Sequence, residues 1–151
     1  MTEGKVVAVS ISEAKGMPKT PISTGKLVKE WGLDGDAHAG KWHRQVSLLA
    51  MESIDKMLAM GADVAPGSFA ENITTSGIDL VSLPIGTQMR IGVALVEVTQ
   101  IGKVCHDRCA IYEQVGDCIM PREGIFVRVL EPGEVSAGDP IIVLGTEERH
   151  E

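Results

Sequence analysis

The chain has 151 residues, the usual length of a single folded domain. Hydrophobic residues make up 44% of it and charged residues 23%, a balance that excludes the disordered and fibrous classes of protein. The formal net charge is −7, and Lys and Arg form no basic run. Because affinity for a duplex comes largely from neutralised phosphates, this charge excludes nucleic acid as the main partner.

The sequence also indicates a compartment. No apolar run approaches the ~20 residues that a membrane-spanning helix needs, and the N-terminal sequence lacks the apolar segment of a secretion signal. The cysteines are odd in number and lie within one stretch of the chain. That pattern favours free or metal-bound thiols in a reducing compartment. We therefore expect a cytoplasmic protein with no membrane partner.

Short β-branched runs between turn residues predict strands. These runs are residues 5–11, 25–32, 72–75, 88–91, 94–101, 125–130 and 141–144. The fourth and fifth predict a hairpin around Gly92. Residues 15–24 contain two prolines and a glycine, which predicts a loop.

Residues 48–60 predict the one clear helix, because apolar side chains recur there at helical spacing. Glu52 and Lys56 are spaced for an ion pair on one helical face, and Gly61 is placed to end the helix. About seven or eight short strands with one helix are typical of a β-barrel or a β-sandwich. We expect one mostly β domain, residues 1–145, followed by an acidic tail, residues 146–151.

Residues 33–46 form the first concentration of polar side chains. Its members are Asp34, Asp36, His38, His43 and Arg44. The two histidines are five apart, which is not the spacing that places two imidazoles on one helical face, so they alone make a weak metal site. The alternative is a polar loop that satisfies its own backbone groups, with Arg44 in a surface ion pair with Asp34 or Asp36.

Residues 103–124 form the second concentration and hold all three cysteines, Cys105, Cys109 and Cys118. The stretch connects two predicted strands, and such connections often carry chemistry on a rigid scaffold. A disulfide between Cys105 and Cys109 is disfavoured, because one helical turn separates the β-carbons by about 5–6 Å and a disulfide needs about 3.8 Å.

Three interpretations of the cysteines remain open. Together with His106 they supply enough ligands for tetrahedral zinc, although the spacing is not that of the usual zinc pairs. Cys105 could instead be a reactive thiolate, with its pKa lowered by Lys103, Arg108 or a helix N-terminus. All three could also be small buried hydrophobes, as free cysteines often are. The polar neighbours of Cys105 make it the best candidate for reactivity.

The order of several motifs resembles the MOSC domain, the C-terminal domain of molybdenum cofactor sulfurases that also occurs as small stand-alone bacterial proteins. These motifs are GLDGDAHAGKWHRQVSLL (32–49), PGSFAENITTSGIDL (66–80), LPIGTQMRIG (83–92), VTQIGKVCH (98–106) and RVLEPGEVSAGD (128–139). The resemblance covers nearly the whole chain. It implies a closed or partly open, pyruvate-kinase-barrel-like β-barrel with a few short helices.

The resemblance also implies a site. The family's motif cysteine falls on Cys105, which is implicated either as a persulfide-bearing sulfur carrier or as the thiolate ligand of molybdenum. Arg44, His38 and Asn72 fall on motif positions that would line the same pocket. Arg44 suits the phosphate of the molybdenum cofactor, molybdopterin, with Lys103 and Arg108 as helpers. Cys109 could act as the resolving thiol.

The implied partners are a cysteine desulfurase-type sulfur donor and a molybdenum cofactor or molybdoenzyme acceptor. The chain has no desulfurase domain, so pyridoxal phosphate would enter only as the partner's cofactor. We therefore expect a domain that binds the molybdenum cofactor or carries sulfur in its biosynthesis or maturation. The alternatives are a reductase of N-hydroxylated compounds that depends on this cofactor, a delivery module without turnover, and a zinc-stabilised structural protein.

Overall fold

The computed structural model describes residues 3–14, 17–102 and 123–146 of the chain. The elements in order are β1 (Glu3–Ile11), β2 (Thr20–Ile22), β3 (Thr24–Val28), β4 (Gly32–Leu33), β5 (Val46–Ala50), α1 (Met51–Ala59), β6 (Ile73–Ser76), η1 (Leu80–Ser82), β7 (Thr87–Ile91), β8 (Ala94–Ile101), β9 (Ile125–Glu131), β10 (Gly133–Ser136) and β11 (Pro140–Thr146). None of the helices in these described ranges is long and apolar enough to cross a membrane.

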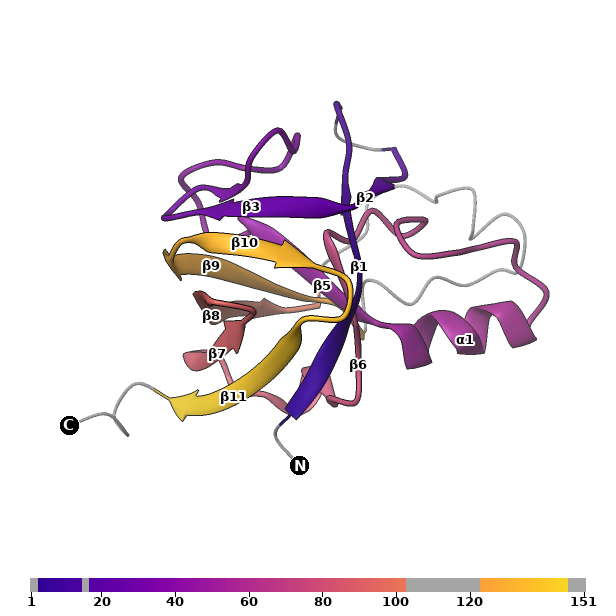
Figure 1. The fold of residues 1–151 in the computed structure, drawn as a ribbon. Helices are drawn as coiled ribbons and strands as arrows, with labels where there is room; N and C mark the ends of the chain where they lie inside the picture. The colour runs from indigo at the N-terminus through magenta and orange to yellow at the C-terminus, as the bar shows by residue number, and fades with distance from the viewer. Residues whose placement is uncertain (1–2, 15–16, 103–122, 147–151) are drawn as a thin grey trace.

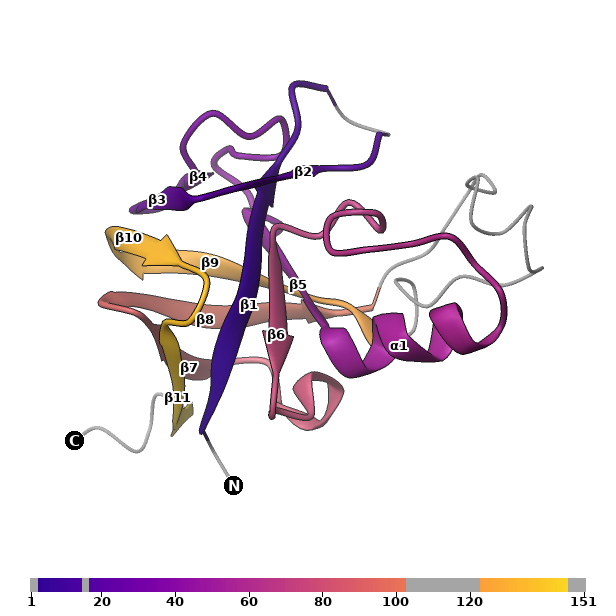
Figure 2. The same ribbon diagram turned by 45° about the vertical axis from the view of Figure 1, so that its right-hand side comes forward.

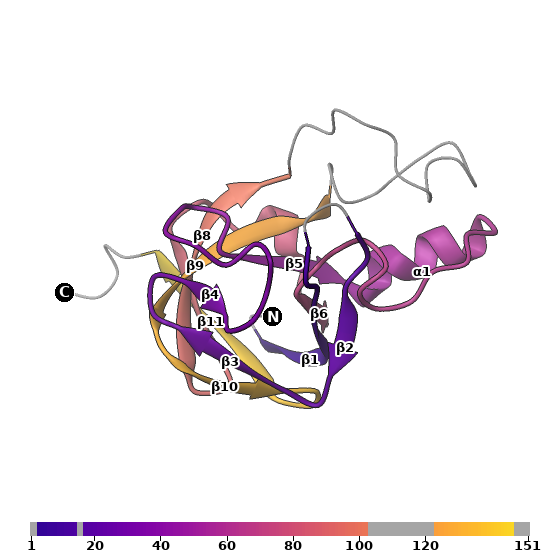
Figure 3. The same cartoon turned by 90° about the horizontal axis from the view of Figure 1, so that it is seen from above.

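Seven of the strands close into one mixed barrel (Figure 1, Figure 3). The order around it is β1, β11, β7, β8, β9, β5 and β6, and β6 then pairs with β1. β5 and β6 run parallel, whereas the other neighbours run antiparallel. The predicted mostly β barrel is thus confirmed, and it is closed. The predicted hairpin around Gly92 is β7 and β8.

Two additions flank the barrel. β2 pairs with β1, and β10, β3 and β4 form a separate three-stranded sheet (Figure 1). The prediction of one strand over residues 25–32 is wrong, because the chain turns at Glu30, whose φ is +51°. The two halves pair with each other as β3 and β4. The loop predicted over residues 15–24 also contains a short strand, β2.

Apolar side chains fill two cores. The first lies inside the barrel and includes Leu48, Ile73, Met89, Ile125 and Ile141. The second lies under α1, which packs outside the barrel beside β5 and β6 (Figure 2), and it includes Leu49, Ile54, Met57, Phe69 and Phe126. A buried side chain of this size contributes about 1.5–3 kcal/mol of hydrophobic free energy.

The helix begins later than predicted, because Leu48, Leu49 and Ala50 belong to β5. This strand is buried on both faces: Leu48 faces the barrel core and Leu49 the core under α1. A strand buried on both faces is continuously apolar and therefore mimics the start of a helix. Gly61 does end the helix, with φ +95°.

The predicted ion pair between Glu52 and Lys56 does not form. The Lys56 ammonium instead lies 3.0 Å from a Glu123 carboxylate oxygen. Glu52 accepts a hydrogen bond of 2.9 Å from the backbone N–H of Gly77. Tertiary partners therefore replace a pair that the local spacing favours by only about 0.2–0.5 kcal/mol.

Candidate functional site

The polar segment 34–45 joins β4 to β5 and carries most of the described candidate residues. It is anchored at its end by Thr99, whose hydroxyl donates a short hydrogen bond to the carbonyl of His43 and lies 3.1 Å from the carbonyl of Phe126. It is anchored in the middle by Trp42, whose indole N–H donates to the carbonyl of His38 over 2.9 Å. The segment is thus a held loop, as predicted, rather than a helix.

A β-bulge in β8 directs a side chain to this loop. Val98 pairs with Val127 and Gln100 pairs with Phe126, so Thr99 is an extra residue in β8. Bulges of this kind re-aim side chains and occur often beside active sites. The result here is that Gln100 meets the end of the polar segment.

Gln100 holds Arg44 and His43 together. Its side-chain amide N–H₂ donates to the carbonyl of Gly102 over 2.6 Å, which leaves Oε1 turned toward the loop. Oε1 lies 3.0 Å from Nε of Arg44 and 2.8 Å from Nε2 of His43. Because a carbonyl oxygen only accepts, both nitrogens donate to it, and His43 carries its ring hydrogen on Nε2.

The Arg44 guanidinium rests between two aromatic rings. Its central carbon lies 5.8 Å from the ring centroid of Trp42 and 5.4 Å from that of Phe126, within the range of cation–π attraction. Among the described residues it pairs with no carboxylate. The alternative ion pair with Asp36 does not form, because that carboxylate binds Lys19. Arg44 is therefore fixed in position while its charge stays uncompensated by the described residues.

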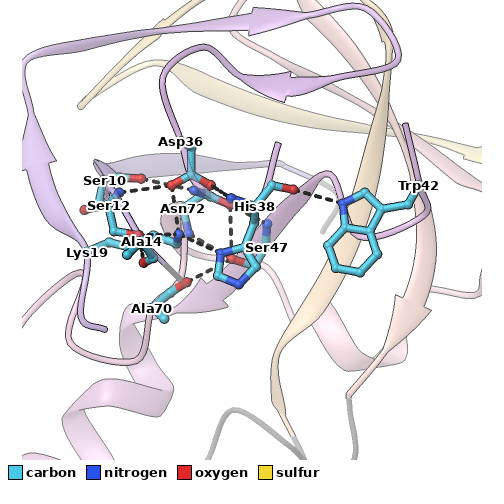
Figure 4. Close-up of polar contacts among 10 residues, drawn as sticks. All are labelled: Ser10, Ser12, Ala14, Lys19, Asp36, His38, Trp42, Ser47, Ala70 and Asn72. Atoms are coloured by element: carbon cyan, nitrogen blue, oxygen red, sulfur yellow. Dashed lines mark hydrogen bonds and ion pairs between the residues drawn. The ribbon is translucent and has the colours of Figure 1, made fainter. Parts of the chain in front are cut away.

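A second cluster lies around the buried side chain of Lys19 (Figure 4). The ammonium lies 2.8 Å from Oδ1 of Asp36, 3.1 Å from the hydroxyl of Ser12 and 3.0 Å from Nδ1 of His38. The side chains of Lys19 and Asp36 are both 0% exposed. Charges this deep require partners of opposite sign and full hydrogen bonding, and these two residues supply both for each other.

Asp36 also organises the backbone of the loop. Oδ1 accepts from the backbone N–H of Ser12 over 3.0 Å, and Oδ2 accepts from that of His38 over 3.1 Å. Burial by itself raises the pKa of Asp36, but the hydrogen bonds from Lys19, Ser12 and Asn72 outweigh it, so the pKa is lowered. The carboxyl is therefore ionised at neutral pH and matches the charge of the lysine.

A backbone hydrogen bond to the turn at Gly67 holds Lys19 in place. The Lys19 N–H donates to the Gly67 carbonyl over 2.8 Å, and a β-carbon at position 67 would clash with the Lys19 carbonyl. Only glycine fits that approach, and its φ is +94°.

The buried carboxylate of Glu71 accepts the N–H groups of Gly67 and Phe69 over 2.8 and 3.2 Å. Burial raises the pKa of Glu71.

Asn72 lies just before β6 and links β1 with β5. Its Oδ1 accepts from the backbone N–H of Ser47 over 3.0 Å, and its Nδ2 donates to the carbonyl of Ser10 over 3.2 Å. The residue is 1% exposed. The described contacts thus give Asn72 a role in holding β1 and β5 beside the cluster, and its direct contact with a ligand stays a prediction.

Trp42 connects the backbone of His38 with the side chain of Arg44, because its indole N–H binds the His38 carbonyl and its ring lies against the guanidinium. Cys105, Cys109, Lys103 and Arg108 lie outside the described residues. So do Cys118 and His106, which the zinc alternative needs. In the described ranges there is no group of three or more His, Cys, Asp or Glu that could hold a metal ion.

Lys19, Trp42 and Gln100 are functional candidates that the sequence did not reveal. Lys19 lies in the proline-containing stretch predicted to be a loop, and a lone lysine carries no sign that it is buried. Gln100 reads as an ordinary polar position of a strand. The one sequence signal that Gln100 belongs to the site was its position five residues before Cys105. The bulge that turns its side chain toward the loop cannot be predicted from the residues alone.

Comparison with known proteins identifies relatives of this architecture. The family profile of the MOSC domain matches residues 35–142. No curated protein matches the chain significantly.

Three solved structures are similar in fold. The YuaD protein from Bacillus subtilis is 21% identical with a TM-score of 0.78, and the match covers 93% of this chain and 95% of that one. YiiM from Escherichia coli is 22% identical with a TM-score of 0.68 and coverage of 96% and 71%. YiiM from Geobacillus stearothermophilus is 19% identical with a TM-score of 0.70 and coverage of 93% and 75%.

Proposed function

Because the chain belongs to the MOSC domain family, we propose that it binds the molybdenum cofactor, with Cys105 as sulfur carrier or molybdenum ligand. The matched range includes Arg44, Asn72 and Cys105, which the motif resemblance predicts as site residues. The proposal therefore concerns one site made from the polar segment 34–45 and the chain after β8.

The observation that carries the proposal is the environment of Arg44. A half-buried guanidinium that meets no described carboxylate, and whose Nε is already fixed by Gln100, keeps its terminal N–H groups available for an anion. A phosphate accepts two such N–H groups in parallel, which a lysine could not match. The aromatic rings of Trp42 and Phe126 hold the guanidinium without neutralising it.

The donor set fits the cofactor in chemical type. Arg44 supplies hydrogen bonds and charge for the phosphate, and His38 supplies an imidazole on the same loop. When bound, the cofactor would supply a molybdenum centre with an affinity for soft thiolate donors. Cys105 is the residue of this chain that we propose to meet it.

As a carrier, Cys105 would act by thiol exchange. Its thiolate sulfur attacks the outer sulfur of the donor's persulfide, a new S–S bond forms on Cys105, and the donor cysteine leaves as a thiolate. The step is balanced without a further oxidant or reductant. Lys103 and Arg108 would favour the thiolate form of Cys105 through their positive charges.

Mass spectrometry of the intact protein tests the carrier function. After incubation with a cysteine desulfurase and cysteine, the wild-type chain should gain the mass of one sulfur atom, and reduction should remove it. Cys105→Ser should gain none, whereas Cys118→Ser, the matched control, should load normally. Equal loading of the Cys105→Ser chain would overturn the carrier role and leave a binding or delivery module.

A further inference from the structure

A cavity lies between the start of α1 and the chain that follows β6, where the turn η1 comes beside the helix (Figure 2). Its volume is about 580 Å³, within the range of pockets that hold small molecules. None of its described lining residues belongs to the 34–45 segment or to the Lys19 cluster. This cavity, which we call the helix cavity, therefore differs in its lining from the anion site at Arg44.

One part of the helix cavity is apolar. Ala50, Ile78 and Leu80 line it, and all three are buried members of the barrel core. Val81 lines it as well, and its side chain is exposed to solvent. Apolar ligand surface that covers such side chains gains about 25 cal/mol for each Å² removed from water. This part of the cavity therefore suits the apolar body of a small molecule.

Hydrogen bonds between separate segments hold the walls of the cavity in place. Glu52 on α1 accepts the backbone N–H of Gly77 over 2.9 Å, which ties the helix to the turn after β6. The hydroxyl of Ser53 and the ammonium of Lys56 both bind Glu123, the ammonium at 3.0 Å, which ties the helix to the chain before β9. Ligand pockets are usually formed before the ligand arrives, and these contacts form this one without a ligand.

The charged groups around the cavity do not balance. Lys56 and Glu123 pair with each other. Glu52 and Asp79 also line the cavity, and neither carboxylate pairs with a cation in the part of the chain that the structure describes. Glu52 lies in the first turn of α1, where the partial positive charge of the helix N-terminus offsets part of its charge. The cavity thus carries an excess of negative charge, with Asp79 as its least compensated member.

We propose that the helix cavity binds a small organic cation, with an apolar body against Ala50, Ile78 and Leu80 and an ammonium beside the carboxylates of Asp79 and Glu52. An anion would meet these two carboxylates, and Glu123 already neutralises the one lysine that could attract it. An uncharged ligand would bury apolar surface but gain no attraction from the carboxylates. The ammonium therefore determines the selectivity of the cavity. This inference does not rest on the proposed function.

Three probes that share a phenyl body and differ in charge test the selectivity. They are phenethylamine, phenethyl alcohol and hydrocinnamate, each titrated into isotopically labelled protein and followed by nitrogen–proton NMR. The amine should move the backbone signals of Gly77, Asp79 and Val81. It should bind about tenfold more tightly than the alcohol, the gain expected for hydrogen bonds to a charged group, and the carboxylate should bind most weakly. An alcohol or carboxylate that bound as tightly as the amine would overturn the proposal, as would an amine that moved none of these signals.

Asp79→Asn tests the source of the selectivity, because it removes one charge and keeps the size of the side chain. Its affinity for phenethylamine should fall by about three- to tenfold, whereas its affinity for the alcohol should not change. Asp55→Asn is the matched control, since Asp55 is an exposed acid of the same helix that does not line the cavity. Equal affinity for the amine in the two variants would remove the role of Asp79 and overturn the proposal.

Val81→Trp tests whether the probes occupy the cavity itself. The larger side chain at this exposed lining position should fill part of the volume and weaken both the amine and the alcohol. Unchanged affinity for both would place the probes elsewhere and contradict the inference. A wild-type chain that bound the molybdenum cofactor but not phenethylamine would contradict this inference alone.

Discussion

Lys19 contacts the 34–45 segment and Arg44 belongs to it, and their charges lie in opposite environments. Lys19 is fully buried, pairs with Asp36 and has all its donors satisfied. Arg44 is half-buried, is held by an amide and two aromatic rings, and meets no described carboxylate. The first cation stabilises the loop, and we propose that the second binds an anionic ligand. Replacing Lys19 should therefore mainly lower the free energy of unfolding, and replacing Arg44 should mainly lower the affinity for the ligand.

The largest effect should come from Lys19→Met. This variant leaves the Asp36 carboxylate buried without its cation, which we expect to lower the free energy of unfolding by about 3–5 kcal/mol. Urea denaturation measures the loss. The double variant with Asp36→Asn should recover most of it, because the unpaired charge is gone. A loss in the single variant no greater than in the double would contradict the charge-pair explanation.

Arg44→Gln should have the opposite profile. Its side chain pairs with no described carboxylate, so the free energy of unfolding should change by less than about 1 kcal/mol. Binding of the isolated molybdenum cofactor should weaken by about ten- to a hundredfold, the value of charge-assisted hydrogen bonds. Arg90→Gln is the matched control, because Arg90 pairs with Glu131 on the surface. Similar affinity in the two variants would remove the phosphate role from Arg44.

A smaller effect is expected at Gln100, which orients Arg44 without contacting the ligand in this account. Gln100→Leu keeps the size of the side chain but removes the acceptor for Nε of Arg44. Affinity for the cofactor should fall by about three- to tenfold, in line with the net value of one neutral hydrogen bond. Titration calorimetry would compare wild type with Gln100→Leu and with the control Gln88→Leu, a half-buried glutamine on β7. If Gln100→Leu bound the cofactor as tightly as wild type, the hydrogen bond from Arg44 to Gln100 would not be needed for binding.

The smallest effect is a change of stability with pH. The pKa of Asp36 lies below its ordinary value of 3.8 in the folded protein, so its stabilisation is present above that value and is lost as pH falls through the folded pKa. Unfolding from about pH 5 to about pH 2 should therefore show a shallower decline in the double variant Lys19→Met with Asp36→Asn than in wild type. Parallel curves of unfolding free energy against pH would mean that the contacts of Asp36 do not stabilise its ionised form.

The same comparison shows what the residues could and could not predict. The polar character of residues 33–46 identified the loop that holds His38 and Arg44, because closely spaced Asp, Gly and His favour a held turn. The partner of Asp36 escaped prediction, since Lys19 lies seventeen positions away and only tertiary contacts between the segments after β1 and after β4 bring it near. The bulge that aims Gln100 also depends on pairing with β9.

The same contrast holds for the fold: features set by neighbouring residues were predictable, and features set by distant contacts were not. The β7–β8 hairpin was predictable because its turn is local. The start of α1 was not, because Leu48 to Ala50 are apolar for a reason that only the two cores explain. The motif order resembling the MOSC domain supplied the barrel, which strand periodicity alone could not separate from a sandwich.

The most direct test of the central claim is elemental analysis of the purified chain after incubation with molybdenum cofactor, with Cys105→Ser and Arg44→Gln measured in parallel. The account predicts molybdenum bound to the wild-type chain, and less of it in both variants. Sulfur in excess of the cysteines and methionines would assign Cys105 to sulfur transfer as well. Equal molybdenum in all three proteins, or stoichiometric zinc with no molybdenum in the wild type, would contradict the account.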